Sequence, residues 1–229
     1  MKFIIIGLGS FGASLATKLT AQGNEVIGVD LKIEKITALK EHISHTISLD
    51  ATDPVAFNSL PIKNTDIVIV AIGENEGANI MVTALCKEAN VKRLISRAIN
   101  NLHEKILHAI GVSEIVHPEE ETAERWSKKL CLSGLIESFE LNSNYSIVEA
   151  FVPTIHIGKT IQEIGFREKY EILVLTILQK TELDSQIGKN RIVTTILHGI
   201  PNPTTRLQEG EIIVLYGNNK NIKDFLQNR

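Results

Sequence analysis

The sequence is poor in the residues that would mark a secreted, zinc-binding or nucleic-acid-binding protein. Its 229 residues include only two cysteines, Cys86 and Cys131. Two cysteines exclude a disulfide framework or a cysteine-rich zinc site, and they fit a reducing compartment. The net charge is −3, so neither a broad phosphate-seeking surface nor non-specific binding to nucleic acid is expected. Charged residues at 22% and apolar residues at 43% exclude global disorder.

Long apolar runs are also missing. The longest, such as residues 67–72, hold about six residues, whereas a membrane-spanning helix needs about 20. The apolar run at residues 3–6 is too short for the core of a signal peptide, and no small-residue cleavage site follows it. We therefore expect a cytoplasmic protein that reaches a membrane only through a partner.

The first part of the chain alternates apolar runs with amphipathic stretches. The run Ile67–Val70 is continuously apolar, as is typical of strands buried on both faces of a parallel sheet. Alternating strands and helices predict a Rossmann-like, doubly wound parallel sheet in residues 1–135. The expected strands lie at 3–6, 25–30, 45–49, 67–71, 93–97 and 114–116, and the expected helices at 10–22, 33–42, 53–59, 75–89 and 101–109.

Residues 136–229 read as a second, smaller α+β domain. Strand-like runs occur at 145–152, 172–178, 191–197 and 211–216, with turn signals such as Pro201-Asn202-Pro203 between them. The stretch Asn219–Gln227 looks helical. A longer helix is expected at 118–132, with Pro118 in its first turn and three glutamates behind it.

Residues 7–12 match the pattern G-x-G-x-x-G, directly after an apolar strand and at the start of a helix. In this context Gly7 permits a tight turn, Gly9 lets the backbone approach a phosphate, and Gly12 lets the helix pack close to the sheet. The helix N-terminus then offers N–H groups and partial positive charge to an anion. The pattern predicts a nucleotide site; the alternative is a glycine-rich turn that has lost its ligand.

A carboxylate, Asp30, ends the second expected strand. At this position it can accept hydrogen bonds from both ribose hydroxyls and would repel a 2′-phosphate. The sequence therefore favours NAD or plain adenine nucleotides over NADP. Leu31 and Lys35, which follow Asp30, belong to the same candidate site.

Two further strand ends point to the same crevice, because the carboxyl ends of parallel strands line the ligand site. They are residues 50–52 and 71–73. The alternative is that both are ordinary strand-to-helix loops, with Asp53 as a helix cap. Together the candidate nucleotide-binding residues of these four segments are Gly7, Gly9, Ser10, Phe11, Gly12, Asp30, Leu31, Lys35, Asp50, Ala51, Thr52, Ala71, Ile72 and Gly73.

The glycine loop, the Asp30 strand end, the two loops and the His-Pro-Glu junction at 117–119 resemble the N-terminal domain of the RCK family (regulator of potassium conductance). The segments 164–170 and 209–217 are similar to its C-terminal subdomain. The resemblance covers essentially the whole chain, and its length fits the Ktr type among TrkA/KtrA-type subunits of bacterial potassium uptake systems.

This resemblance implies a regulatory role. Such subunits form homo-oligomers, as dimers and octameric rings, under a membrane potassium-translocating subunit of TrkH/KtrB type. An adenine nucleotide, ATP/ADP or NAD/NADH, binds in the crevice and sets the ring's shape, which opens or closes the pore. In some members the C-terminal subdomain binds cyclic di-AMP. We therefore expect a peripheral protein at the inner face of the cell membrane and no enzymatic activity.

Three residues carry family-specific expectations. Ser10 stands where Ktr-type loops usually have an arginine, and its hydroxyl carries no charge to discriminate ATP from ADP, which leaves NAD, ADP and AMP open as ligands. Arg97 matches a basic position facing the phosphates; its alternative is a solvated charge at a strand end. Glu119 matches an acidic residue that approaches the phosphates with the help of a divalent or monovalent cation; its alternative is a charge at a helix N-terminus.

Two other functional classes remain open at this stage, an NAD-dependent oxidoreductase and a nucleotide or redox sensor acting on another partner. None of the seven histidines stands with a carboxylate and a cysteine at ligand spacing, and no Ser/Tyr-x-x-x-Lys pair follows the fourth strand. Apolar residues on the long helix, Trp126, Leu130 and Leu132, favour an oligomer interface over a core stripe within one chain.

Overall fold

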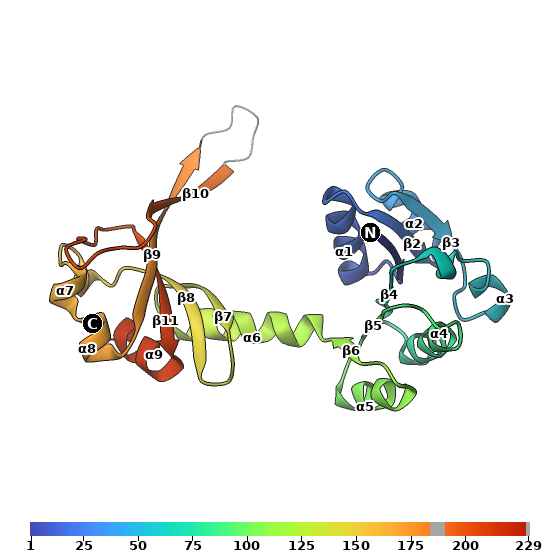
Figure 1. Ribbon diagram of the computed structural model, residues 1–229. Helices are drawn as coiled ribbons and strands as arrows, with labels where there is room; N and C mark the ends of the chain where they lie inside the picture. Colours follow the sequence, from blue (N-terminus) through green and yellow to red (C-terminus); the bar gives the residue numbers. More distant parts are fainter. Residues whose placement is uncertain (184–190, 228–229) are drawn as a thin grey trace. The chain divides into compact units, whose positions relative to one another are not determined.

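The computed structural model describes residues 1–183 and 191–227, and the chain divides into two compact units, Met1–Glu120 and Glu121–Arg229 (Figure 1). The long helix α6, Pro118–Cys131, begins in the first unit and continues into the second. This division lies earlier than the boundary after residue 135 that the sequence suggested, because that boundary assigned the whole helix to the first half.

The first unit is built on a six-stranded sheet in which every neighbouring pair is parallel. The strand order is β3-β2-β1-β4-β5-β6. Strands β2 and β3 therefore follow on one side of β1, and strands β4, β5 and β6 follow on its other side. This arrangement confirms the predicted doubly wound fold and places a switch point between β1 and β4. The strands are β1 (Lys2–Ile6), β2 (Glu25–Asp30), β3 (His45–Ser48), β4 (Ile67–Val70), β5 (Leu94–Arg97) and β6 (Glu114–Val116).

Helices cover both faces of this sheet. Within β1, Ile5 packs in the cluster that α1 (Ser10–Ala21) and α2 (Ile33–Leu39) contribute to. Ile4 and Ile6 pack in the cluster on the opposite face, which includes residues of the other helices. The continuous apolar strand thus fills two cores at once. These other helices are α3 (Pro54–Phe57), α4 (Glu76–Glu88) and α5 (Asn101–Ile110), with a 3-10 turn η1 at Ile62–Asn64.

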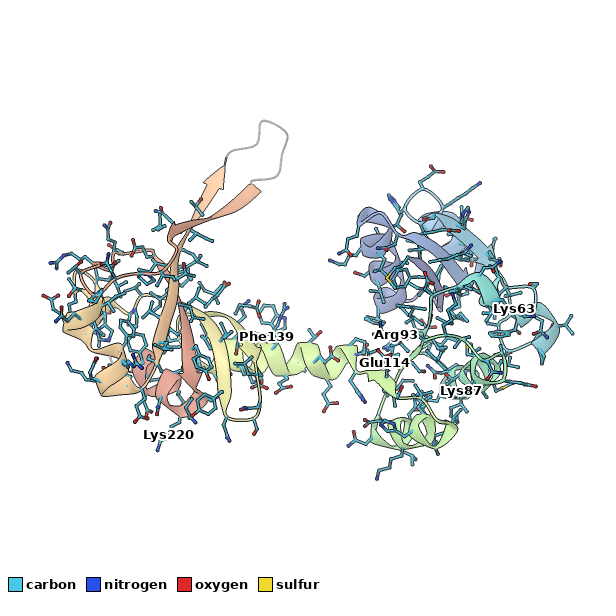
Figure 2. All side chains as sticks on the ribbon, in the orientation of Figure 1. Lys63, Lys87, Arg93, Glu114, Phe139 and Lys220 are labelled. Atoms are coloured by element: carbon cyan, nitrogen blue, oxygen red, sulfur yellow. The ribbon has the colours of Figure 1, made fainter. Side chains whose placement is uncertain are left out.

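The outer edge of the sheet carries an exposed ion pair. Arg93, just before β5, donates from Nε and Nη2 to the two carboxylate oxygens of Glu114 on β6, at 2.7 and 2.6 Å (Figure 2). The side-chain hydrogen bonds, and to a smaller extent the attraction between the charges, raise the pKa of Arg93 and lower that of Glu114. Because both side chains are exposed, the pair contributes little to the stability of the fold.

The second unit is an antiparallel sheet with helices packed against it. Its strand order is β10-β9-β11-β8-β7. Phe225 and Ile222 of the last helix pack with Ile213 and Leu215 of β11 in one buried cluster. After α6 the elements are β7 (Leu135–Glu140), β8 (Tyr145–Phe151), the 3-10 turn η2 (Thr154–His156), α7 (Ile161–Ile164), α8 (Phe166–Tyr170), β9 (Leu173–Leu183), β10 (Arg191–His198), β11 (Ile212–Asn218) and α9 (Asn219–Gln227).

The predicted α+β character of this unit is confirmed, but four of its elements were not predicted: β7, η2, α7 and α8. Helices α7 and α8 are too short to show a helical period. They are defined by their ends: Thr160 and Glu163 form a reciprocal capping box, and Gly165 separates the two helices with a φ of 69°. Across the described ranges, no helix combines the length and the apolar character that crossing a membrane requires.

Candidate functional site

The glycine loop joins β1 to α1 in a turn that depends on its glycines. Gly7 has a φ of 98° and donates from its N–H to the Val29 carbonyl at 2.8 Å, which joins the loop to β2. A Cβ on Gly12 would overlap the Gly7 carbonyl oxygen, so only glycine lets α1 start this close to the strand. A Cβ on Gly9 would meet nothing within 4 Å. Gly9 therefore faces open space, where a ligand can approach the backbone.

Helix α1 leaves its N-terminal end free for an anion. Gly9 occupies the N-cap position with no side-chain capping bond, and no acidic residue stands in the first turn. The first N–H groups of a helix lack intrahelical partners, and they carry partial positive charge. This end of α1 therefore has the chemistry of a phosphate site.

Asp30 lies at the end of β2 with only 8% of its surface exposed. Its Oδ2 accepts a hydrogen bond from the Leu8 N–H at 2.7 Å, and its Oδ1 accepts one from the Lys32 N–H at 2.9 Å. Lys35 Nζ lies 3.4 Å from Oδ2. These donors hold the carboxylate rigidly beside the glycine loop, and each oxygen keeps further acceptor capacity for a ribose hydroxyl.

The loop after β3 presents a second carboxylate. Asp50 Oδ1 accepts from the Thr52 N–H at 3.0 Å and from the Thr52 hydroxyl at 2.7 Å. These two hydrogen bonds lower the pKa of Asp50, which keeps it ionised. Asp53 caps α3 by accepting from the Val55 N–H at 3.0 Å, as the alternative interpretation of this loop expected. The loop therefore supplies both a helix cap and a lining for the cleft.

Arg97, at the end of β5, reaches across the loop that follows β4. A Cβ on Gly73 would overlap the guanidinium of Arg97, so the arginine lies directly on the Gly73 backbone. Its Nη2 donates to a carboxylate oxygen of Glu119 in the first turn of α6. Its Nε is buried and has no hydrogen-bond partner among the described residues. Buried donors are normally paired, so this nitrogen is an exception to the usual rule.

These segments line one cleft of about 520 Å³ at the carboxyl ends of the parallel strands. Of the residues predicted from the sequence, the cleft is lined by Gly7, Gly9, Ser10, Asp30, Leu31, Lys35, Asp50, Ala51, Thr52, Ala71, Ile72, Gly73, Arg97 and Glu119.

Phe11 and Gly12 are the predicted residues that do not line the cleft. Phe11 is partly buried and packs with the cluster under α1 and α2, since its place in the first turn of α1 directs it into the core. The expectation that Phe11 contacts the ligand is therefore not supported by its position. Gly12 does not face the ligand; its lack of a side chain allows α1 to lie close to the Gly7 carbonyl.

Three charged or polar lining residues were missed by the sequence analysis: Lys32, Glu74 and Asn75. Glu74 Oε2 lies 3.5 Å from Lys32 Nζ, and Glu74 Oε1 lies 4.0 Å from Lys35 Nζ. The available signal was position alone, because Glu74 directly follows the loop 71–73 and Lys32 follows Asp30 by two residues. Their pairing joins loops that are distant in the sequence.

Among the side chains that the structure describes, the histidines do not form a metal site with the cysteines. His117, before α6, has its Nε2 3.6 Å from Glu104 and its Nδ1 3.7 Å from Glu120. His103 and His156 are buried, and burial lowers the pKa of each. Within residues 1–183 and 191–227, no group of three or more histidine, cysteine or acidic side chains is arranged to hold a metal ion.

Comparison with known proteins gives consistent results for sequence and fold. The model of the TrkA-N domain family matches residues 3–118. Ktr system potassium uptake protein C of Bacillus subtilis is 33% identical over 224 residues, 98% of this chain and 95% of the relative. Ktr system potassium uptake protein A of the same organism is 31% identical, with the same two shares covered.

Solved structures share the fold at lower sequence identity. The GsuK RCK domain matches 99% of this chain with a TM-score of 0.64 and 18% identity. The GsuK channel bound to NAD matches 98% of this chain with a TM-score of 0.61 and 18% identity. The match covers 47% of the GsuK RCK domain chain and 38% of the GsuK channel chain, so this protein spans about half or less of the length of these structures. By sequence and by fold, the chain belongs to the TrkA-N family, as its resemblance to RCK proteins predicted.

Proposed function

We propose that this protein is a nucleotide-sensing regulatory subunit of a membrane potassium transporter. The observation that carries the proposal is one combination. A cleft has a glycine loop, a ribose-type carboxylate and an arginine nitrogen with no partner among the described residues. It occurs in a chain that matches Ktr potassium uptake proteins along nearly its whole length. The position of the cleft agrees with the general rule that ligands bind where a doubly wound sheet reverses its strand order.

The ligand we propose is an adenine nucleotide, ATP, ADP or NAD(H). Asp30 binds the ribose hydroxyls, the backbone at Gly9 and the first turn of α1 bind the first phosphates, and Arg97 binds the distal phosphate. The diphosphate supplies the negative charge that these donors neutralise. Ser10 adds a hydroxyl rather than a charge at the loop, so Arg97 carries most of the discrimination between ligands with different numbers of phosphates.

The coupling step that we propose is competition for Arg97. Arg97 pairs with Glu119 at the start of α6. A phosphate that takes this arginine leaves the Glu119 carboxylate near a second negative group, so Glu119 either moves away or is bridged to the phosphate by a cation. Either response acts on the first turn of α6, the helix that leads into the second unit. A ligand shifts such an equilibrium only by its difference in affinity for the two states.

We further propose a homo-oligomer, a dimer within an octameric ring, that docks on the cytoplasmic side of a potassium-translocating membrane subunit. Trp126 and Leu130 on α6 support an interface between subunits, since 50% and 79% of their surfaces are exposed in the single chain. Binding of cyclic di-AMP to the second unit stays a prediction from the family resemblance.

The main experiment joins binding to transport. The purified protein is titrated with ATP, ADP, NAD and NADH by calorimetry, and potassium flux is then measured in proteoliposomes that contain the membrane subunit, with and without this protein. We expect binding of at least one nucleotide and a change in flux that depends on it. Binding without any effect on flux would instead support a sensor that acts on another partner, and no binding would refute the nucleotide site.

The proposed role is non-catalytic. The relatives named above are potassium uptake components, which supports regulation rather than turnover. An oxidoreductase would consume NADH, so absorbance at the nicotinamide band is followed with common carbonyl substrates. We expect no loss of absorbance beyond that of a control without protein; a steady, protein-dependent loss would favour the dehydrogenase alternative.

Glu119 is tested separately, because a competing carboxylate and a cation-bridging carboxylate respond oppositely. If Glu119 only competes for Arg97, then Glu119→Gln raises the affinity for ADP, and magnesium has no effect on the difference. If Glu119 holds a cation against the phosphates, the same substitution lowers affinity and removes its dependence on magnesium. Glu121→Gln, the acidic residue two positions along the same helix, serves as the matched control. Equal affinities of the wild type and Glu119→Gln under both conditions would remove Glu119 from the site.

A further inference from the structure

A buried polar network lies directly behind the cleft, on α4. Asn79 is fully buried, and its amide nitrogen donates both hydrogens, to the Ile72 carbonyl at 2.9 Å and to the Arg97 carbonyl at 3.1 Å. Its amide oxygen accepts from the Ser96 hydroxyl at 3.1 Å and from the Thr83 hydroxyl at 3.4 Å. These four hydrogen bonds, here named the Asn79 clamp, use the full capacity of the amide group.

The Asn79 clamp joins two strands at the point where their own pairing ends. The register of β4 and β5 pairs Val70 with Ser96 as its last match. Beyond that match, the carbonyls of Ile72 and Arg97 receive the two hydrogens of Asn79. A side chain from α4 therefore sets the distance between the two strand ends, where no backbone ladder does.

The clamped strand ends carry the two groups that meet in the cleft. Gly73 directly follows Ile72, and its backbone lies against the guanidinium of Arg97. The arginine side chain is only 14% exposed, and its Nε has no partner in the described part of the chain. A small shift of one strand end relative to the other would move the guanidinium away from the position where a phosphate meets it.

We propose that Asn79 is a positioning residue for phosphate recognition: by clamping Ile72 to Arg97, it holds the Arg97 guanidinium in place over Gly73. The inference rests on the proposed nucleotide function and adds a residue that does not line the cleft. Asn79 acts through Arg97, so its effect is confined to the phosphate end of the ligand. The ribose end, held by Asp30 on β2, is independent of it.

The test compares a ligand with phosphates to one without. Dissociation constants for ADP are measured by calorimetry and those for adenosine by ligand-observed NMR, on the wild type, Asn79→Leu and Arg97→Ala. Loss of a charge-assisted hydrogen bond predicts that Asn79→Leu weakens ADP binding by about tenfold and leaves adenosine within about twofold. The affinity ratio of the two ligands is the readout, because a general loss of stability would lower both affinities together.

A double-mutant cycle tests the route through Arg97. If Asn79 acts by positioning Arg97, then Asn79→Leu causes no further loss of ADP affinity once Arg97 is alanine. Additive losses in the double variant would overturn the inference, as would an unchanged ratio of ADP to adenosine affinity in Asn79→Leu. A wild type that binds neither ligand would instead refute the nucleotide site itself and the inference with it.

Two further variants keep the test decisive if Asn79→Leu does not fold. Ser96→Ala removes one donor to the Asn79 oxygen and loosens the clamp, so it is expected to weaken ADP binding about threefold without affecting adenosine. Thr65→Val is the matched control, because Thr65 is also buried and its hydroxyl donates to the Pro61 carbonyl at 2.9 Å, outside the cleft lining. This control is expected to lower the melting temperature and leave the ratio unchanged; an equal ratio in Ser96→Ala and the wild type would overturn the inference.

Discussion

The guanidinium of Arg97 occupies the space that any side chain at position 73 would need, so this arginine and Gly73 form a single unit at the phosphate end of the cleft. The two residues come from different elements: Gly73 lies in the loop after β4, and Arg97 is the last residue of β5. Their contact explains why the loop after β4 has a glycine, and it leads to the first prediction.

Gly73→Ala is expected to displace Arg97 and to weaken ADP binding by about tenfold, because a charged hydrogen bond to the phosphate is lost. Calorimetry on the folded variant measures the change. Gly199→Ala is the control, since a Cβ at that glycine would meet no atom of the described residues within 4 Å. ADP affinity in Gly73→Ala equal to that of this control would show that Arg97 does not bind the phosphate.

Changing Gly9 to alanine is expected to lower nucleotide affinity, whereas changing Gly12 to alanine is expected to lower folding stability. Gly9→Ala keeps the melting temperature within a few degrees, because the added Cβ meets open space, but it blocks the approach of the phosphate and lowers affinity at least tenfold. Gly12→Ala costs about 3 kcal/mol of folding stability, because its Cβ overlaps the Gly7 carbonyl oxygen. Thermal melts with and without ADP separate the two effects. Equal melting temperatures for the two variants would contradict this assignment.

Asp30→Ala is expected to weaken nucleotide binding by about ten- to a hundredfold, because the ribose loses a charged acceptor. It also destabilises the fold, since the buried Leu8 N–H loses its partner. Asp30→Asn keeps one acceptor oxygen and should retain more of both properties. Asp66→Asn is the control carboxylate, because Asp66 accepts from the Lys2 N–H at the opposite ends of the strands. Unchanged affinity in Asp30→Ala would remove this residue from the site.

His156 is expected to make the second unit sensitive to acid. The imidazole stacks on Phe225 at a centroid distance of 4.9 Å, and burial together with Lys159 and Lys169 lowers its pKa below 6.5. The folded state therefore binds this proton less readily than the unfolded chain, in which a histidine titrates near pH 6.5. The stability that this residue contributes is complete above about pH 6.5 and decreases as the pH falls below it.

The variant His156→Phe is expected to remove this pH dependence. The free energy of unfolding of the second unit is measured in urea at pH 7.5 and pH 5.5. We expect it to be lower at pH 5.5 in the wild type, and the difference between the two pH values to be smaller in the variant. The exposed His42, changed to glutamine, is the control and should leave the pH dependence as it is in the wild type. An identical pH dependence in His156→Phe and the wild type would exclude His156 as its source.

The architecture of the first unit could be predicted because its signals are local. A continuous apolar strand such as Ile67–Val70 predicts a parallel sheet, and a glycine pattern between strand and helix predicts the turn. The second unit was predicted less well. Its helices α7 and α8 span four and five residues, too few to show a period, and Gly165 decides where one ends and the next begins.

The sequence by itself determined which strand ends carry the candidate site, since parallel strands bring their carboxyl ends to one edge whatever the details of packing. Only the tertiary structure decided how the side chains meet there. It placed Arg97 on Gly73 and against Glu119, turned Phe11 into the core, and put Asn79 behind the cleft as a clamp. These contacts join residues far apart in the chain through side-chain geometry, and no local pattern of residues encodes the distance between two strand ends.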